Sequence, residues 1–203
     1  MPDQEKQHIK SNDHLTVEQD CILLEAFIAG NRYAYSLIYK KYVNELFAYG
    51  MGLNFERETV KDAIQEVFYK LHTHKQQLKS VSNVKYYLLR MLKNHLLNHY
   101  RSQVETNEID EITFSVHTTI LDELITEEEQ AQLQSQVDKL LQVLTDRQRE
   151  AVYLRFIQEM EYEEIGALLE ITPQASRKLI SRAIKRMREE DSALLLLLLL
   201  YVN

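Results

Sequence analysis

The sequence predicts an all-α protein of two small helical domains joined by an acidic linker. Apolar residues recur at helical spacing through both halves of the chain, whereas the alternation that marks strands is nearly absent. The 203 residues include only four glycines and two prolines, so few positions interrupt a long helix. With 45% hydrophobic residues, the chain has enough apolar surface for a core in each domain.

Charge is distributed unevenly along the chain, whose formal net charge is -7. Residues 104–136 contain nine of the 31 acidic residues and no Lys or Arg, which leaves 22 acidic against 24 basic residues elsewhere. We interpret this stretch as the linker, because blocks of like charge repel and stay solvated. The predicted organisation is a disordered N-terminus at 1–14, domains at 15–103 and 137–190, the linker at 104–136 and a Leu-rich tail at 191–203.

The first domain begins with two helices whose ends are marked by capping residues. Thr16 and Gln19 form a capping-box pattern that starts the first helix, and Gly30 can end it. Asn31 can cap the second. The apolar side chains expected in the core are Cys21, Leu24, Phe27, Ile28, Tyr35, Leu37, Ile38, Tyr42, Leu46, Phe47 and Tyr49.

A third helix is predicted over 58–71 by apolar residues at helical spacing. The stripe expected inside consists of Val60, Ala63, Ile64, Val67, Phe68 and Leu71. The outward side then carries Asp62, Gln65, Glu66 and Tyr69. Polar residues interleaved with an aromatic one suit a protein contact as well as solvent, and the residues alone leave both interpretations open.

A fourth helix, capped by Asn83 after a polar loop, lies in a strongly basic stretch. Residues 70–104 contain seven Lys or Arg and no Asp or Glu, with Tyr86, Tyr87 and Tyr100 interleaved. Cations neutralise phosphates and aromatic rings stack on bases, so this surface suits single-stranded nucleic acid. The alternative is that the tyrosines belong to the core and the lysines are merely solvated.

Sequence patterns for catalysis and for metal binding are absent. Cys21 is the only cysteine, which excludes a disulfide framework, and with no secretory signal pattern the expected compartment is the cytoplasm. His95 and His99 stand four residues apart, but no third ligand is evident. No glycine-rich phosphate loop, HExxH pattern or nucleophile elbow is present. We therefore predict no catalytic residue, no metal and no cofactor, in a protein that is not an enzyme.

The segment 162–188 predicts a helix-turn-helix, in which the second helix enters the DNA major groove. Residues 162–169 form the short first helix, and Thr172 can cap a second helix with Pro173 at its first position. Glu170 occupies the turn, where glycine is frequent. One face of the second helix carries Ala175, Leu179, Ile180, Ala183, Ile184 and Met187, and the other carries Arg177, Lys178, Arg182, Lys185 and Arg188. The alternative is an amphipathic helix hairpin with a solvated basic face.

Together the two halves resemble the extracytoplasmic-function (ECF) group of the sigma-70 family of bacterial RNA polymerase sigma factors. K-D-A-I-Q-E-V-F-Y-K-L resembles the family's D-x-x-Q-E-x-F helix. L-L-R-M-L-K-N-H-L-L-N-H-Y-R resembles its helix ending in N-x-x-x-D-x-x-R, with Asn98 in place of the Asp. The segment that begins E-Y-E-E-I-G-A-L-L is similar to sigma region 4, although Gly166 and Ser176 stand where Ala and a branched apolar residue are commoner. The resemblance covers 15–101, like region 2, and 137–190, like region 4.

The resemblance implies a sigma factor that binds core RNA polymerase and directs promoter recognition and transcription initiation. Asp62, Gln65 and Glu66 match the surface that docks on the polymerase clamp helices; Phe68 matches as well, but its spacing places it inside. The implied contacts to the melted minus-10 element are Lys79, Tyr86, Tyr87, Lys93, Asn94 and Arg101. The implied contacts to the minus-35 duplex are Gln174, Arg177, Lys178 and Arg182.

The acidic linker and the Leu-rich tail lie outside the two predicted domains. The linker either threads the basic channel of the polymerase, as the family implies, or is a solvated tether. The seven leucines at 194–200 are far fewer than the roughly 20 residues that span a bilayer, so no membrane insertion is expected. We hypothesise that this tail packs on the chain's own domains or on a partner, an inhibitory anti-sigma factor being one candidate.

The competing function is a stand-alone helix-turn-helix regulator, which normally reads paired half-sites as a dimer.

Overall fold

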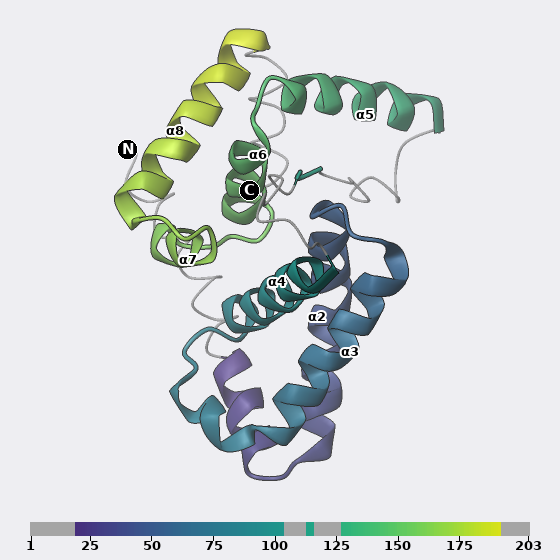
Figure 1. Ribbon diagram of the computed structural model, residues 1–203, viewed down its shortest axis with the longest axis vertical. Coiled ribbons are helices and arrows are strands. Elements are labelled where there is room, and N and C mark those ends of the chain that lie inside the picture. The colour runs from purple at the N-terminus through teal and green to yellow at the C-terminus, as the bar shows by residue number, and fades with distance from the viewer. Residues whose placement is uncertain (1–18, 104–112, 116–126, 192–203) are drawn as a thin grey trace, which may run out of the picture. The chain divides into compact units, whose positions relative to one another are not determined.

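The protein is described by a computed structural model for residues 19–103, 113–115 and 127–191 (Figure 1). All regular structure in these ranges is helical, which confirms the all-α prediction. The chain divides into two compact units, 1–51 with 55–110 and 52–54 with 111–203. The N-terminus at 1–14 with the Thr16 cap, most of the linker, and the tail beyond residue 191 lie outside the described residues. The domain boundaries drawn from the sequence stay predictions.

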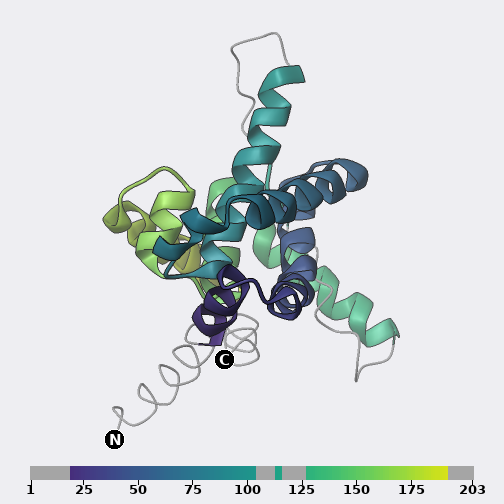
Figure 2. The same cartoon turned by 90° about the horizontal axis from the view of Figure 1, so that it is seen from below.

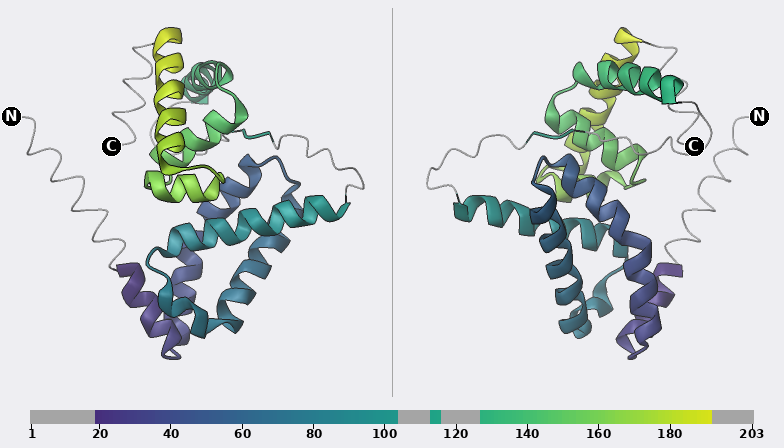
Figure 3. Two further views of the ribbon diagram at one scale, coloured as in Figure 1. Left: turned by 60° about the vertical axis from the view of Figure 1, so that its left-hand side comes forward. Right: turned by 90° about the vertical axis from the view of Figure 1, so that its right-hand side faces the viewer.

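The described part of the first unit contains a helical segment at 19–28 and three longer helices. These are α2 (Arg32–Gly52), α3 (Arg57–Thr73) and α4 (Val84–Gln103). A 3-10 helix, η1 (Lys75–Ser80), stands where the sequence predicts only a polar loop, and its Leu78 is buried. The C-terminal turns of α4 extend beyond α2 and α3 (Figures 2 and 3). None of the helices in the described ranges combines the length and the apolar character that crossing a bilayer requires.

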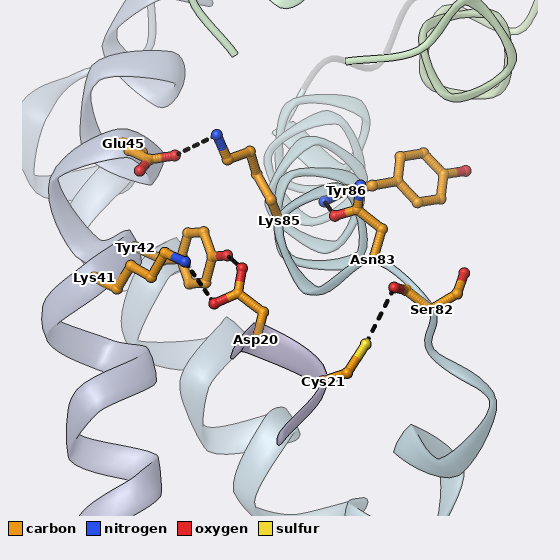
Figure 4. A network of polar contacts seen from close by, with 9 residues as sticks. All are labelled: Asp20, Cys21, Lys41, Tyr42, Glu45, Ser82, Asn83, Lys85 and Tyr86. Carbon is orange, nitrogen blue, oxygen red and sulfur yellow. Dashed lines mark hydrogen bonds and ion pairs between the residues drawn. The ribbon is translucent and has the colours of Figure 1, made fainter. Parts of the chain in front are cut away.

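The backbone confirms the predicted helix ends in the first unit. Gly30 has a φ of 104° and ends the first helical segment in a conformation that other residues disfavour. Asn31 caps α2, because its Oδ1 accepts a hydrogen bond from the backbone N–H of Tyr33 at 2.9 Å. Asn83 caps α4 in the same way, accepting from the N–H of Tyr86 at 3.0 Å (Figure 4).

The buried stripe of α3 is the one that the sequence predicts. Its buried residues are Val60, Ala63, Ile64, Val67, Phe68 and Leu71. Phe68 is 2% exposed and packs against α2, with ring centroids 4.7 Å from Tyr39 and 6.3 Å from Tyr35. The polar residues of α3 therefore face outward.

A buried carboxylate fixes the first helical segment on α2 (Figure 4). Asp20 pairs with Lys41 Nζ at 2.6 Å and accepts a hydrogen bond from the buried hydroxyl of Tyr42. Burial raises the pKa of Tyr42, and the hydrogen bond and charge of Asp20 raise it further. The neighbouring Cys21 is half-buried rather than a core residue, and its thiol donates to the carbonyl of Ser82 at 3.5 Å. The segment is thereby tied to α2 and to the loop that precedes α4.

The described part of the second unit contains α5 (Glu127–Gln142), α6 (Asp146–Phe156), α7 (Tyr162–Leu168) and α8 (Pro173–Glu190). The start of α5 lies inside the stretch that the sequence assigns to the linker. Thr145 opens α6 with a capping box, because Gln148 N–H donates to Thr145 Oγ1 at 3.3 Å and Gln148 Oε1 accepts from Thr145 N–H at 3.2 Å. The core joins α5, α6 and α8 through Leu140, Leu144, Val152, Ala183 and Met187.

A short described piece of the predicted linker, residues 113–115, is anchored on α6. Phe114 is 1% exposed, and its ring centroid lies 5.4 Å from that of Tyr153. Its backbone N–H donates to Asp146 Oδ1 at 3.1 Å, and the same carboxylate pairs with Arg149 at 2.7 Å. At this point the acidic stretch is held by packing and a hydrogen bond.

The predicted helix-turn-helix is present, with α7 lying across the N-terminal end of α8 (Figures 1 and 3). Thr172 caps α8 by accepting from the N–H of Ala175 at 3.2 Å, and Pro173 occupies the first helical position. The buried hydroxyl of Ser176 donates a hydrogen bond that is shared between the carbonyl oxygens of Tyr162 and Pro173, each 2.8 Å away. A hydrogen bond therefore joins the two helices at this position.

The turn between α7 and α8 holds a non-glycine residue in the left-handed region. Glu170 has a φ of 55°, a conformation that costs an ordinary residue roughly 1 to 2 kcal/mol. The N–H of Ile171 donates to the carbonyl of Gly166 at 2.8 Å, and a Cβ on Gly166 would lie 2.9 Å from the carbonyl oxygen of Ile171. Arg147 of α6 donates to the carbonyl of Leu169 at 2.8 Å. The turn is thus closed by hydrogen bonds that offset the strain.

Replacing Glu170 with glycine is expected to stabilise the second unit by about 0.5 to 1 kcal/mol, because glycine adopts this φ without steric penalty. Thermal unfolding of the full chain should therefore show a higher Tm for Glu170→Gly. The control is Glu163→Gly, the same change at an exposed position of α7, which should lower the Tm because glycine weakens a helix. An unchanged or lower Tm for Glu170→Gly would contradict the strain assigned to this turn.

Candidate polymerase and nucleic-acid interfaces

The three residues predicted to bind polymerase lie together on the outer face of α3. Asp62 and Gln65 are exposed, and Glu66 is half-buried. Glu66 pairs with Lys70 at 3.3 Å, an accessible helical pair that adds little to stability. Tyr69, which is 63% exposed, continues this face by one turn. The face offers a carboxylate, an amide and an exposed aromatic ring, a residue type enriched where proteins meet.

The residues predicted to capture the minus-10 strand lie on one side of α4, with the exception of Lys79. At 100° per residue, a sector of about 120° holds Tyr86, Tyr87, Lys93, Asn94 and Arg101. Asn94 and Arg101 are exposed, and both tyrosines are half-buried. Arg90, which sequence reasoning does not single out, lies in the same sector and donates to the hydroxyl of Tyr86 at 3.3 Å. Burial raises the pKa of Tyr87, so its hydroxyl stays protonated.

The cationic surface of the first unit is smaller than the sequence count indicates. Lys70 and Lys85 form ion pairs with carboxylates of α3 and α2 at 3.3 and 3.5 Å. Lys75 Nζ lies 4.6 Å from the ring centroid of Phe27. The exposed basic side chains in this stretch are Lys79, Arg90 and Arg101.

Lys79 belongs to η1 and not to α4. It lines a hollow of about 320 Å³ together with Cys21, Leu24 and Leu78. Its side chain is exposed, as a phosphate contact requires, and its assignment to the minus-10 element stays a prediction.

The residues predicted to read the minus-35 element all lie on the exposed face of α8. Gln174, Arg177, Lys178 and Arg182 are exposed. The opposite face buries Ser176, Ile180, Ala183 and Met187. The predicted packing face is confirmed in its centre, whereas Ala175, Leu179 and Ile184 are only half-buried. Arg186, which is not one of these four residues, is turned toward α6 and donates to Gln148 Oε1 at 3.0 Å.

One aromatic ring at the start of α7 contacts two arginines. The guanidinium carbon of Arg155 lies 4.9 Å from the Tyr162 ring centroid, and that of Arg177 lies 4.8 Å from it. Both distances are within the range of cation–π attraction. Tyr162 and Arg177 belong to different helices, so no helical period in the sequence pairs them.

Comparison with protein families covers both units. Residues 38–106 match the model of Sigma-70 region 2, and residues 134–187 match that of Sigma-70, region 4. The chain is also similar to the ECF RNA polymerase sigma factor SigM of Bacillus subtilis (strain 168), with 21% identity over 152 residues, 74% of this chain and 91% of that protein. The chain belongs to the ECF group of the sigma-70 family. The resemblance drawn from its motifs is confirmed, and nothing in these comparisons favours a stand-alone regulator.

Two solved structures share the fold of this ECF sigma factor. One is CnrH in complex with the cytosolic domain of CnrY, with a TM-score of 0.56 and 19% identity over 86% of this chain and 97% of that one. The other is the sigma factor RpoE in complex with the anti-sigma factor NepR from Bartonella quintana, with a TM-score of 0.54 and 19% identity over 76% of this chain and 94% of that one.

His95 of α4 is part of no metal cluster in the described residues, where no group of three or more potential ligands is found. Burial lowers its pKa most and the charge of Lys70 lowers it further, whereas Glu66 raises it and His99 lowers it by less than Glu66 raises it. Because its folded-state pKa lies below the ordinary value of 6.5, the unfolded chain binds the proton first as the pH falls. Stability contributed by neutral His95 is therefore lost from about pH 6.5 downward.

The variant His95→Gln is expected to lose less Tm than the wild-type protein between about pH 7.5 and 5.5, because glutamine does not take up this proton. Thermal unfolding followed by circular dichroism across that range measures the difference. His74→Gln, which removes an exposed imidazole, controls for the loss of a histidine as such. A pH profile of His95→Gln that coincides with the wild type would contradict this assignment.

Proposed function

We propose that this ECF sigma factor docks on core RNA polymerase through the outer face of α3, captures the opened minus-10 strand with α4, and reads the minus-35 duplex with α8. The observation that carries the proposal is the presence of two separate stretches, 70–104 and 171–188, that contain basic but no acidic residues in an acidic chain. Initiation requires one surface for a parted strand and another for a closed double helix, and these two stretches supply them.

The α4 face has the chemistry needed to hold unpaired bases. Opening a duplex costs a few kcal/mol per unstacked step, and base–aromatic stacking recovers roughly 1 to 3 kcal/mol per base. Tyr86 and Tyr87 supply the rings, and Arg101 supplies a counter-charge for phosphate. Arg90 extends the cationic surface beside Tyr86. Asn94 adds an exposed amide for the edge of a base.

The α8 face has the chemistry needed to read base edges in an intact duplex. Gln174 and Arg177 lie in its first turns, the part of a recognition helix that contacts bases. A bidentate arginine contact to guanine discriminates against other bases by about 1 to 3 kcal/mol. Lys178 and Arg182 present further exposed donors one and two turns along.

This assignment places the protein with the polymerase and the chromosome, in the bacterial cytoplasm, and gives it no catalytic activity of its own. The acidic linker would be repelled by promoter phosphates, so we propose that it runs along a basic part of the polymerase instead. The solved relative RpoE was captured with its anti-sigma factor. An anti-sigma factor is therefore a proposed partner of this chain as well, and the Leu-rich tail is a candidate segment for that contact.

Run-off transcription by purified core polymerase from the source organism, with and without the protein, tests the proposal. The wild-type chain should give a promoter-dependent product, and Asp62→Ala with Gln65→Ala should reduce it by weakening the capture of core polymerase in a pull-down. Lys40→Ala with Asn44→Ala, which alters exposed residues of α2, is the control and should bind as the wild type does. No promoter-dependent product with the wild-type chain would overturn the function, and wild-type affinity of the double α3 variant would overturn the docking face.

Arg182→Ala is expected to weaken duplex binding by roughly 5- to 150-fold with loss of base discrimination, since a base-reading arginine is worth about 1 to 3 kcal/mol. Fluorescence anisotropy with duplexes selected by the wild-type protein, and with point-substituted versions of them, measures both effects. Arg188→Ala removes an equal charge at the far end of α8 and should lower affinity uniformly, without changing sequence preference. An unchanged preference in Arg182→Ala would reject its base-reading role.

A further inference from the structure

The contact between Tyr162 and Arg177 joins the two helices of the helix-turn-helix at the surface that faces DNA in the proposed function. Arg177 is exposed on α8, and its guanidinium carbon lies 4.8 Å from the ring centroid of Tyr162. Tyr162 is half-buried and is the first residue of α7. Within the described residues, the guanidinium of Arg177 contacts this ring.

Tyr162 is held in place by contacts to its backbone and to its ring. The carbonyl oxygen of Tyr162 lies 2.8 Å from the hydroxyl of Ser176, which is buried in the first turns of α8. Arg155 contacts the same ring at 4.9 Å and is itself fixed, because it donates to the carbonyl of Met160 at 2.7 Å and pairs with Glu161 at 3.6 Å. The ring therefore has a defined position relative to the start of α8.

We propose that Tyr162 is a positioning residue for promoter recognition, which acts by orienting the guanidinium of Arg177 toward a guanine in the minus-35 duplex. This inference rests on the proposed function and adds to it a residue on α7. Tyr162 does not itself reach the base edge in this proposal. It restricts a long, flexible side chain to the orientation in which its donors meet the groove.

The chemistry of the pair suits this role. A guanidinium that contacts an aromatic ring through its face keeps its N–H donors at the edge, where two of them can pair with O6 and N7 of guanine. An unrestrained arginine loses considerable side-chain freedom when it binds, and a preoriented one loses less. Removing the ring should therefore weaken recognition by about two- to fivefold, the size of an exposed cation–π contact.

The test is a double-mutant cycle with the full chain bound to core polymerase. The probe is a labelled duplex selected from a pool with a randomised central segment, and a second duplex carries a substitution of the guanine whose preference Arg177→Ala abolishes. Tyr162→Leu should weaken binding to the selected duplex about two- to fivefold and reduce the preference for that guanine. Tyr162→Phe retains the ring and should restore both.

The cycle separates positioning from a general effect on the fold. In an Arg177→Ala background, Tyr162→Leu should have no further effect on affinity, whereas in an Arg182→Ala background its effect should persist in full. An equal effect of Tyr162→Leu in both backgrounds, or failure of Tyr162→Phe to restore the preference, would overturn the inference.

The same data distinguish this inference from the proposed function. If Arg182→Ala loses base discrimination while Tyr162→Leu binds as the wild type does, the positioning role fails and the recognition surface stands. If neither variant changes binding to any duplex, the assignment of α8 to duplex reading fails, and the positioning role fails with it.

Discussion

The burial of one apolar stripe on each helix decides where the functional side chains of this sigma factor lie. On α3, Phe68 belongs to the buried stripe, and Asp62 and Gln65 on the opposite side are therefore exposed. On α8, Ile180 belongs to the buried stripe, and Arg182 is exposed. A shift of one position would rotate each residue by about 100° and bring a charge into the core, which is costly without a partner. The packing that folds each unit and the surfaces proposed to contact polymerase and DNA are consequently fixed by the same residues.

The turn of the helix-turn-helix contains a non-glycine residue in a backbone conformation that favours glycine. Glu170 takes a left-handed conformation at a cost of roughly 1 to 2 kcal/mol. The hydrogen bonds from Ile171 to Gly166 and from Arg147 to Leu169 hold the turn, at roughly 0.5 to 1.5 kcal/mol each. The absence of a side chain on Gly166 admits the close approach of the turn. Gly166 thus provides space within α7 for the turn. The left-handed conformation of Glu170 is imposed by the hydrogen bonds of its neighbours.

Local patterns predicted the parts of the structure that depend on neighbours in sequence. The α3 stripe, the Asn83 and Thr172 caps and the cationic face of α8 all follow from helical period or capping chemistry. Contacts between distant segments carried no such signal. Phe114 is anchored on α6, and Lys85 forms an ion pair with Glu45 of α2, although each lies in a stretch of one charge sign. The family resemblance supplied the roles of the site residues, and the structure contributes their exposure and neighbours.

The two cationic surfaces differ in where their aromatic rings lie, and the difference fits what each surface holds in the proposed function. On α4, Tyr86 and Tyr87 are on the same helical face as the cations. This placement fits the proposed role, because a parted strand exposes the flat faces of its bases, on which rings can stack. A closed duplex offers only base edges, and a ring at the tip of a recognition helix has nothing to stack against. The ring of Tyr162 lies on α7, with its centroid 4.8 Å from the guanidinium carbon of Arg177. In our proposal the ring orients this arginine, whose N–H donors are the groups that can pair with base edges in a duplex.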